Sequence, residues 1–202
     1  MNPYIMTTRE YLTALKSLHG ISAGIGLLVP GVSFFTKMDP PLLSGAGLVT
    51  AGLGAASIVS AYHYAPRERT SSSAFPLFTR IARRMFFLSL LSLLMYLLLL
   101  RWCTVTDPRG ENRFQTGFGI ADWSLTADGL KLKQEYPGVT RIDLMLLKGA
   151  FRDGGPELIW SSWSIYTSGI LMTVAYLSTF MLWVFAWSLL AKQRAISDKQ
   201  IP

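Results

Sequence analysis

The sequence predicts an all-α membrane protein: a four-transmembrane-helix bundle with a small mixed extracytoplasmic domain between helices 3 and 4. Three observations predict this fold class. Half of the 202 residues are apolar, only 15% are charged, and the mean hydropathy is +0.34, which is too apolar for an ordinary water-soluble domain. The apolar residues gather in four long blocks, and the basic residues gather at particular ends of those blocks.

The length of each block indicates whether it can cross a membrane as a helix. A helix that rises about 1.5 Å per residue needs roughly 20 apolar residues to cross a hydrocarbon layer about 30 Å thick. Uncharged runs of 20, 27, 16 and 34 residues occupy 17–36, 40–66, 85–100 and 158–191. The third run is short, but long arginine side chains flank it and reach toward the headgroups. The fourth exceeds what a crossing needs, so we place that span near Tyr166 to Leu190.

Any one of these blocks could be a buried helix of a soluble protein, but four in one small chain exclude that interpretation. The first block also differs from a cleavable signal peptide, because it follows Glu10 and has no small-residue exit site. The predicted organisation is a tail (1–16), a hairpin of helices 1 and 2 (17–66), a basic loop (67–84), helix 3 (85–102), an outer segment (103–160), helix 4 (161–191) and a second tail (192–202).

Charge predicts the orientation of the chain. The two tails and the basic loop carry ten basic and three acidic residues, whereas the remainder carries nine of each. By the positive-inside rule, both termini are cytoplasmic and about 103–160 is extracytoplasmic. Tryptophans are expected at the two interfaces: Trp102, Trp160 and Trp163 outside, Trp183 and Trp187 inside.

The basic loop is expected to contact lipid headgroups rather than nucleic acid, because its cations flank apolar spans. The residues concerned are Arg67, Arg69, Arg80, Arg83 and Arg84.

Small residues predict where the helices pack, since helices in lipid associate through close contact. The predicted packing residues are Gly20, Gly24, Gly47, Ala51, Ala55, Ser164 and Ser168. The same residues could instead join copies of the chain, as a homo-oligomer or a membrane-complex subunit, or line a pore. No Asp, Glu, Lys or Arg lies in the middle of a span, which argues against a coupled transporter.

The sequence contains no convincing active site. His19 and His63 are predicted at the same depth and could ligate haem or a metal, but His63 also fits an interfacial belt between two tyrosines. Cys103 is the only cysteine, which suits an apolar filler or a bridge between two copies. We therefore expect a non-enzymatic protein without catalytic residues, metal or cofactor.

Local signals predict several elements in the outer segment. Alternating apolar residues from Arg113 to Ile120 predict a short strand. Thr126 is a candidate cap for a helix that reaches Tyr136, although the Leu-Lys-Leu-Lys alternation leaves a strand as an alternative. Thr140 and Asp143 form a variant capping box that predicts a helix to about Arg152. Pro156 is expected in the first turn of the helix that continues into the fourth span.

The helix after Thr140 carries more apolar residues than a small domain can bury, so it should lie against the membrane, the span ends or a partner. The alternative is a small cap that merely closes the bundle. The predicted partner-binding residues are Phe114, Phe118, Trp123, Leu144, Leu147 and Phe151.

Two termini inside, a short first outer loop and a large second one resemble the tetraspanin plan in topology. A tetraspanin's large loop depends on several cysteines, and none follows Cys103 here, so the chain is not assigned to that family. The shape is also similar to small four-span bacterial membrane components of phage-defence and toxin-immunity systems. The absence of an Asn-x-Ser/Thr sequon favours a bacterial inner membrane.

Together these features predict an inner-membrane protein that acts through protein contact, as a sensor, scaffold or immunity subunit. Membrane lipid and a protein that meets the outer segment are its expected partners, and direct binding of nucleic acid is not expected. The alternative function is an oligomeric channel or a membrane-disrupting effector.

Overall fold

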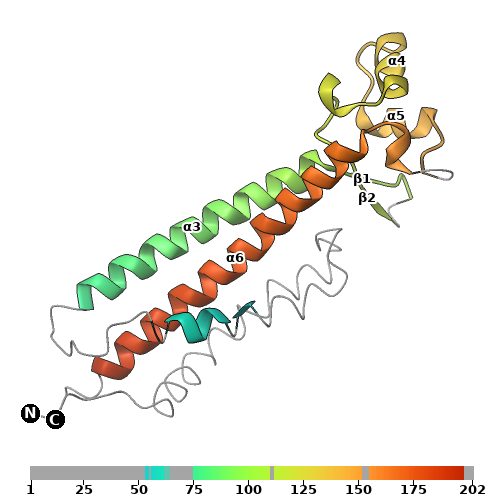
Figure 1. The fold of residues 1–202 in the computed structure, drawn as a ribbon. Coiled ribbons are helices and arrows are strands. Elements are labelled where there is room, and N and C mark those ends of the chain that lie inside the picture. Colours follow the sequence, from blue (N-terminus) through green and yellow to red (C-terminus); the bar gives the residue numbers. More distant parts are fainter. Residues whose placement is uncertain are drawn as a thin grey trace, which may run out of the picture. The chain divides into compact units, whose positions relative to one another are not determined.

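The computed structural model describes residues 53–54, 56–61, 63, 75–109, 112–151 and 155–197, and these are mostly helical (Figure 1). Two long helices, α3 (Phe75–Trp102) and α6 (Ser162–Ser197), flank the outer segment along the chain. The contacts divide the chain into two units, and the boundary crosses α3 after Leu93 and α6 before Leu177.

Both long helices are apolar enough to cross a membrane, by length and composition. The qualifying stretches are Leu77–Trp102, with mean hydropathy 2.0, and Ser162–Gln193, with mean hydropathy 1.8. In the apolar 18-residue window of each stretch, only 17% and 28% of the residues are buried, whereas the core helix of a soluble protein is mostly covered. Of the four predicted spans, two are therefore present as long apolar helices in the described part of the chain.

The predicted first span lies outside the described residues. Within the second predicted span, residues 53–54, 56–61 and 63 are helical. The third helix begins at Phe75 rather than at Met85, so the prediction of a loop up to residue 84 was wrong. Arg80, Arg83 and Arg84 instead lie on the early turns of α3, where the helix continues beyond its uncharged stretch.

In the first unit, α3 and α6 contact each other through aromatic rings and through the hydroxyls of Ser89 and Thr79, the latter with Gln193 at 3.2 Å. The Phe86 ring lies edge-on to the rings of Trp183 and Trp187, with centroid distances of 5.1 and 5.5 Å. Ser89 Oγ donates a 2.9 Å hydrogen bond to the carbonyl oxygen of Thr179. A hydroxyl that bonds to the backbone of a neighbouring helix is a contact that small polar residues also make in membrane bundles.

The second unit contains the ends of both long helices and the outer segment. Its strands β1 (Thr104–Thr106) and β2 (Arg113–Gln115) pair antiparallel, with Val105 opposite Phe114. Next come the short 3₁₀ turn η2 (Asp122–Ser124), helices α4 (Ala127–Glu135) and α5 (Arg141–Leu147), and a second 3₁₀ turn, η3 (Pro156–Leu158). The small mixed domain predicted between the third and fourth spans is present.

The caps of α4 and α5 follow the prediction. Thr126 Oγ1 accepts a 3.1 Å hydrogen bond from the Gly129 amide, which confirms the helix and excludes the strand alternative. Thr140 and Asp143 form the reciprocal capping box. α5 nevertheless ends at Leu147 and not near Arg152, because Gly149 adopts a left-handed φ of 65°.

Two other boundaries differ from the prediction. β2 ends at Gln115 rather than at Ile120, because the chain turns at Gly117 to Gly119 and forms a 2.9 Å backbone hydrogen bond there. Pro156 begins the separate turn η3, and α6 starts only at Ser162, after Ser161 Oγ accepts a hydrogen bond from the Ser164 amide.

Candidate functional site

The first turns of α6 hold the outer segment through their serine side chains. Ser164 Oγ accepts a 3.1 Å hydrogen bond from the Phe118 amide, and Ser168 Oγ donates a 2.8 Å bond to the Thr116 carbonyl. Both serines are fully buried. A Cβ atom at Gly117 would lie 2.3 Å from Ser164 Oγ, so only glycine allows this approach. The two serines are therefore packing residues, but their hydrogen bonds go to the outer segment and not to another long helix.

Trp160 occupies the centre of the outer segment's core. It is fully buried, and its indole N–H donates a 2.5 Å hydrogen bond to the carbonyl of Gly119. The prediction that Trp160 marks the outer interface as an anchor was wrong, because the turn before α6 directs its side chain inward. Its core neighbours include Val105, Leu125, Leu144 and Ile159.

Arg141 connects the start of α5 to the end of α3. Its guanidinium donates to the carbonyl oxygens of Arg101 at 2.9 Å and Thr104 at 3.4 Å, and also to the carbonyl of Trp102. The last carbonyls of a helix lack partners within the helix and carry partial negative charge, so a cation is favourable there. Nothing in the local sequence of Arg141 indicated this role, since its acceptors lie about forty residues earlier.

α5 contacts the end of α3 through Arg141 at its start and contacts α4 through Lys148 at its C-cap. At its far end the Lys148 ammonium lies 2.9 Å from an Asp128 carboxylate oxygen, which lowers the pKa of Asp128 by hydrogen bonding and by charge. Hydrogen bonds from Thr140 likewise lower the pKa of Asp143. Leu144 and Met145 face inward and are fully buried, whereas Ile142, Leu146 and Leu147 are 44 to 52% exposed. We call these three exposed residues the α5 face.

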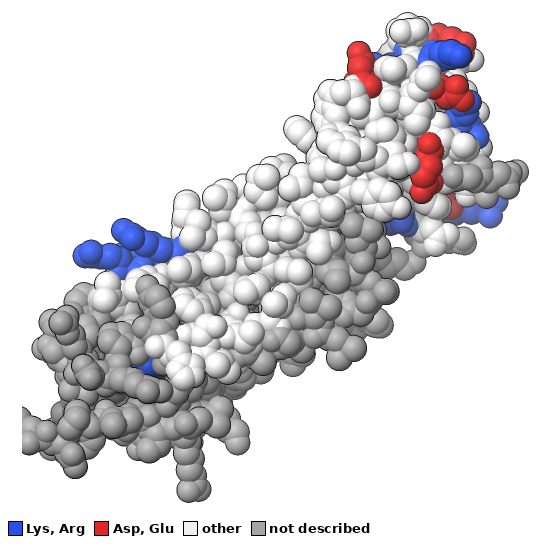
Figure 2. Space-filling model, in the orientation of Figure 1, with Lys and Arg blue, Asp and Glu red and all other residues white. Residues whose placement is uncertain are grey.

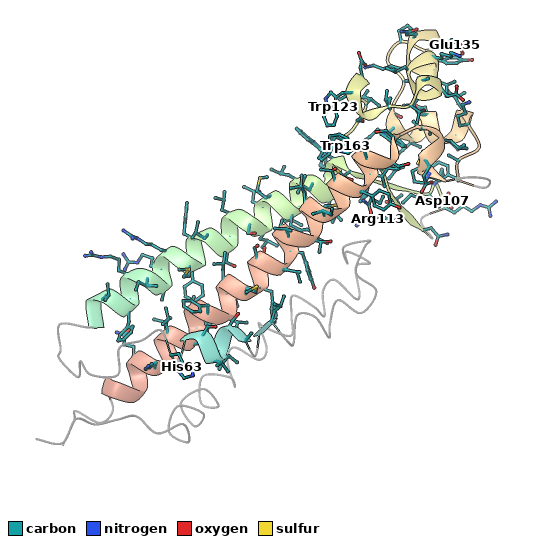
Figure 3. All side chains as sticks on the ribbon, in the orientation of Figure 1. His63, Asp107, Arg113, Trp123, Glu135 and Trp163 are labelled. Carbon is teal, nitrogen blue, oxygen red and sulfur yellow. The ribbon has the colours of Figure 1, made fainter. Side chains whose placement is uncertain are left out.

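A second exposed apolar surface is aromatic. The ring centroids of Phe118 and Trp123 lie 5.3 Å apart, and those of Trp123 and Trp163 lie 5.8 Å apart. Trp123 and Trp163 are 60 and 61% exposed. We call Phe118, Trp123 and Trp163 the aromatic row. In Figure 3, Trp123 and Trp163 lie on one side of the second unit, while Asp107 and Arg113 lie on the other.

The six predicted partner-binding residues therefore separate into two groups. Phe118, Trp123 and Leu147 contribute to exposed surfaces. Leu144 is a core residue, and Phe114 and Phe151 pack against that core with their ring centroids 5.6 Å apart. For Leu144 in particular, full burial is incompatible with direct contact to a partner. The many apolar residues of the helix predicted after Thr140 are thus divided between the core and the surface.

The predicted headgroup residues Arg80, Arg83 and Arg84 are exposed on α3, and Figure 2 shows basic side chains projecting there. Arg67 and Arg69 lie outside the described residues, as do the predicted packing residues Gly20, Gly24, Gly47, Ala51 and Ala55.

Of the three chemical groups considered from the sequence, His19, His63 and Cys103, the structure describes the last two. His19 lies outside the described ranges, and His63 is exposed. Cys103 is fully buried, and burial raises the pKa of its thiol to about 11, so it is neither a nucleophile nor placed to bridge two copies. Among the described residues, no group of three or more His, Cys, Asp or Glu side chains is placed to hold a metal ion.

Comparison with protein-family models, with curated proteins and with solved structures found no match for this chain.

Proposed function

We propose that this chain is a non-enzymatic integral membrane protein of a bacterial inner membrane that acts by contact, as a sensor, scaffold or immunity subunit. In this proposal four helices cross the bilayer, both termini are cytoplasmic, and about 103–160 recognises a protein partner outside. The chain works as a homo-oligomer or as a subunit of a larger membrane complex.

The observation that carries the proposal is the exposed α5 face outside two long apolar helices. Ile142, Leu146 and Leu147 are held rigidly, because α5 is capped at its start by Thr140 and tied at its two ends to α3 and α4. Large apolar side chains on a fixed helix are typical of protein contact surfaces. The balanced charge of the outer segment adds no preference for nucleic acid.

The α5 face also differs from the outer segment's other surfaces. On α4, charged side chains form ion pairs with neighbouring elements, at 2.5 Å for Lys133 with Asp122 and at 2.9 Å for Lys148 with Asp128. Figure 2 shows acidic and basic side chains side by side over this end of the second unit. Such mixed polar surface remains solvated, whereas the α5 face gains free energy when a partner covers it.

A photo-crosslinking amino acid placed at Leu147 in living cells tests the proposal. We expect an adduct with an extracytoplasmic protein, or with a second copy of the chain, because this side chain is half exposed on the α5 face. The matched control is the same amino acid at Gln134, an exposed position on α4, which we expect to give no adduct. An adduct with a cytoplasmic protein would contradict the orientation, and equal labelling at both positions would contradict a specific surface.

The alternative function, an oligomeric channel or membrane-disrupting effector, needs polar side chains along a pore. Ser89, Ser164 and Ser168 are candidates by position, but each has a hydrogen-bond partner within the chain. This use of the hydroxyls favours the contact protein. Reproducible conductance of the purified protein in a planar bilayer would favour the channel instead.

A further inference from the structure

The aromatic row begins at the end of a candidate span. Trp163 is the second residue of α6, and the apolar stretch of that helix starts at Ser162. Trp102 ends the corresponding stretch of α3 and is 66% exposed. If these stretches cross the bilayer, then Trp102 and Trp163 both lie at its outer boundary, where tryptophan is enriched.

Trp123 comes from a different element but lies at the same level. It belongs to η2, some forty residues before α6, and its ring lies edge-on to that of Trp163. Two hydrogen bonds join the elements of the row near the start of α6: Ser161 N donates to the carbonyl of Ser124 in η2 at 3.0 Å, and the Phe118 amide donates to Ser164 Oγ at 3.1 Å. The row is therefore joined to the start of α6 by hydrogen bonds as well as by the ring contact.

The charge beside Trp123 is neutralised within the chain. Asp122 lies next to it in sequence, and its carboxylate is 2.5 Å from the ammonium of Lys133. Lys133 also donates a 2.9 Å hydrogen bond to the carbonyl of Ile120. Pairing reduces the cost of bringing an acidic side chain toward an anionic, partly dehydrated surface. Glu135, in contrast, lies at the far end of α4 in Figure 3, away from the row.

We propose that the aromatic row lies in the headgroup layer of the phospholipid bilayer, so that the η2 turn is a membrane contact of the outer segment in addition to the two helix ends. An indole has an apolar body and a polar N–H, which suits the boundary between hydrocarbon and water. Continuity with the end of α6 favours lipid over a protein as the occupant. This membrane contact rests on the proposed function insofar as α3 and α6 must cross the membrane.

Nitroxide labels in the full-length protein, reconstituted into nanodiscs of phosphatidylcholine and phosphatidylglycerol, test this contact. The variants are Trp123→Cys in the row, Gln134→Cys on α4 and Leu97→Cys on the exposed side of α3. Cys103 is retained, because it is buried and its thiol has a raised pKa of about 11, and the parent protein measures any background labelling. Frequent collisions of the nitroxide with oxygen indicate that the label lies in lipid. Frequent collisions with a water-soluble nickel complex indicate that it lies in water.

We expect the label at position 123 to collide with nickel several-fold less often than the label at 134, and with oxygen more often. Equal nickel collision at 123 and 134 would overturn the contact. So would an immobilised label at 123 that meets neither reagent, because a protein would then cover the row. The label at 97 separates this failure from that of the proposed function, since nickel access there would show that α3 does not cross the bilayer.

Trp163→Cys provides a second variant in case loss of the Trp123 ring disturbs η2. Its label is expected to show the same oxygen preference, within twofold, as the label at 123, because the two rings are in contact. A label at 163 that prefers oxygen while the label at 123 prefers nickel would also overturn the proposal.

Discussion

The outer part of the second unit and the paired long helices of the first unit are stabilised in different ways. In the outer segment, the Trp160 indole and the Arg141 guanidinium have defined acceptors, and the α6 hydroxyls of Ser164 and Ser168 bond to the segment's backbone. In the first unit, the indole nitrogens of Trp183 and Trp187 are buried and have no hydrogen-bond partner among the described residues. Buried polar groups with defined partners are therefore a feature of the outer segment, whereas the described helix pair combines ring packing and unpaired indole nitrogens with the hydroxyl bonds of Ser89 and Thr79.

This difference predicts that single substitutions act more strongly in the outer segment than in the long helices. Substitution of a buried group that has several partners removes its transfer free energy, its packing contacts and its hydrogen bonds together. In the helix pair most leucine side chains are exposed. The pair therefore loses little stabilising free energy when one contact between the helices is removed.

The largest effect is expected for Trp160→Ala. The substitution leaves a cavity in the core and removes the hydrogen bond to Gly119, which should cost about 3–5 kcal/mol in the free energy of unfolding of the outer segment. Limited proteolysis at rising temperature measures it. Trp123→Ala is the matched control, because that side chain is 60% exposed, and we expect a change below about 1 kcal/mol. Similar losses for both variants would contradict the assignment of Trp160 to the core.

An intermediate effect is expected for Arg141→Met. Loss of the guanidinium leaves the carbonyls of Arg101 and Trp102 without their charged donor, at a cost of about 1.5–3 kcal/mol. Local opening should then expose Cys103, and its modification by a maleimide should become roughly tenfold faster for each 1.4 kcal/mol lost. Arg109→Met, at an exposed position outside this contact, should leave the rate unchanged. An unreactive Cys103 in Arg141→Met would show that Arg141 does not hold the outer segment in place.

The smallest effect is expected for Ser89→Ala. Its hydrogen bond to the Thr179 carbonyl joins α3 to α6, and bonds of this kind contribute about 0.6 kcal/mol on average in membrane bundles. Unfolding of the reconstituted protein in mixed micelles measures the change, with Leu90→Ala as an exposed control on the same helix. If Ser89→Ala lowered the free energy of unfolding as much as Trp160→Ala, the expected difference in sensitivity between the two regions would be contradicted.

Features that depend on neighbouring residues were predictable from the sequence. Thr126 and Thr140 cap their helices as expected, because a hydroxyl reaches the backbone amide three residues later wherever the rest of the chain lies. The two described long apolar helices follow equally from composition, since about twenty uncharged apolar residues form a helix that has few alternatives. Their boundaries were less accurate: α3 includes arginines that charge counting had placed in a loop.

Features that depend on distant residues were not predictable. Leu144 and Leu147 look alike in the sequence, yet one is fully buried and the other half exposed, because only the packing of α5 on Val105 and Trp160 decides which face is covered. The targets of Ser164 and Ser168 were missed for the same reason. A seam of serines indicates close approach, but it does not say whether the approaching backbone is a helix or a turn of the outer segment.

For this protein, the sequence by itself determined the apolar helices, the local caps and the charge asymmetry, because these arise from composition and from contacts within a few residues. The tertiary structure alone decided that Trp160 faces inward while Trp123 faces outward, and that Arg141 caps a helix forty residues away. The physical reason is that burial and long-range hydrogen bonding are properties of pairs of surfaces, and a linear pattern specifies only one member of each pair.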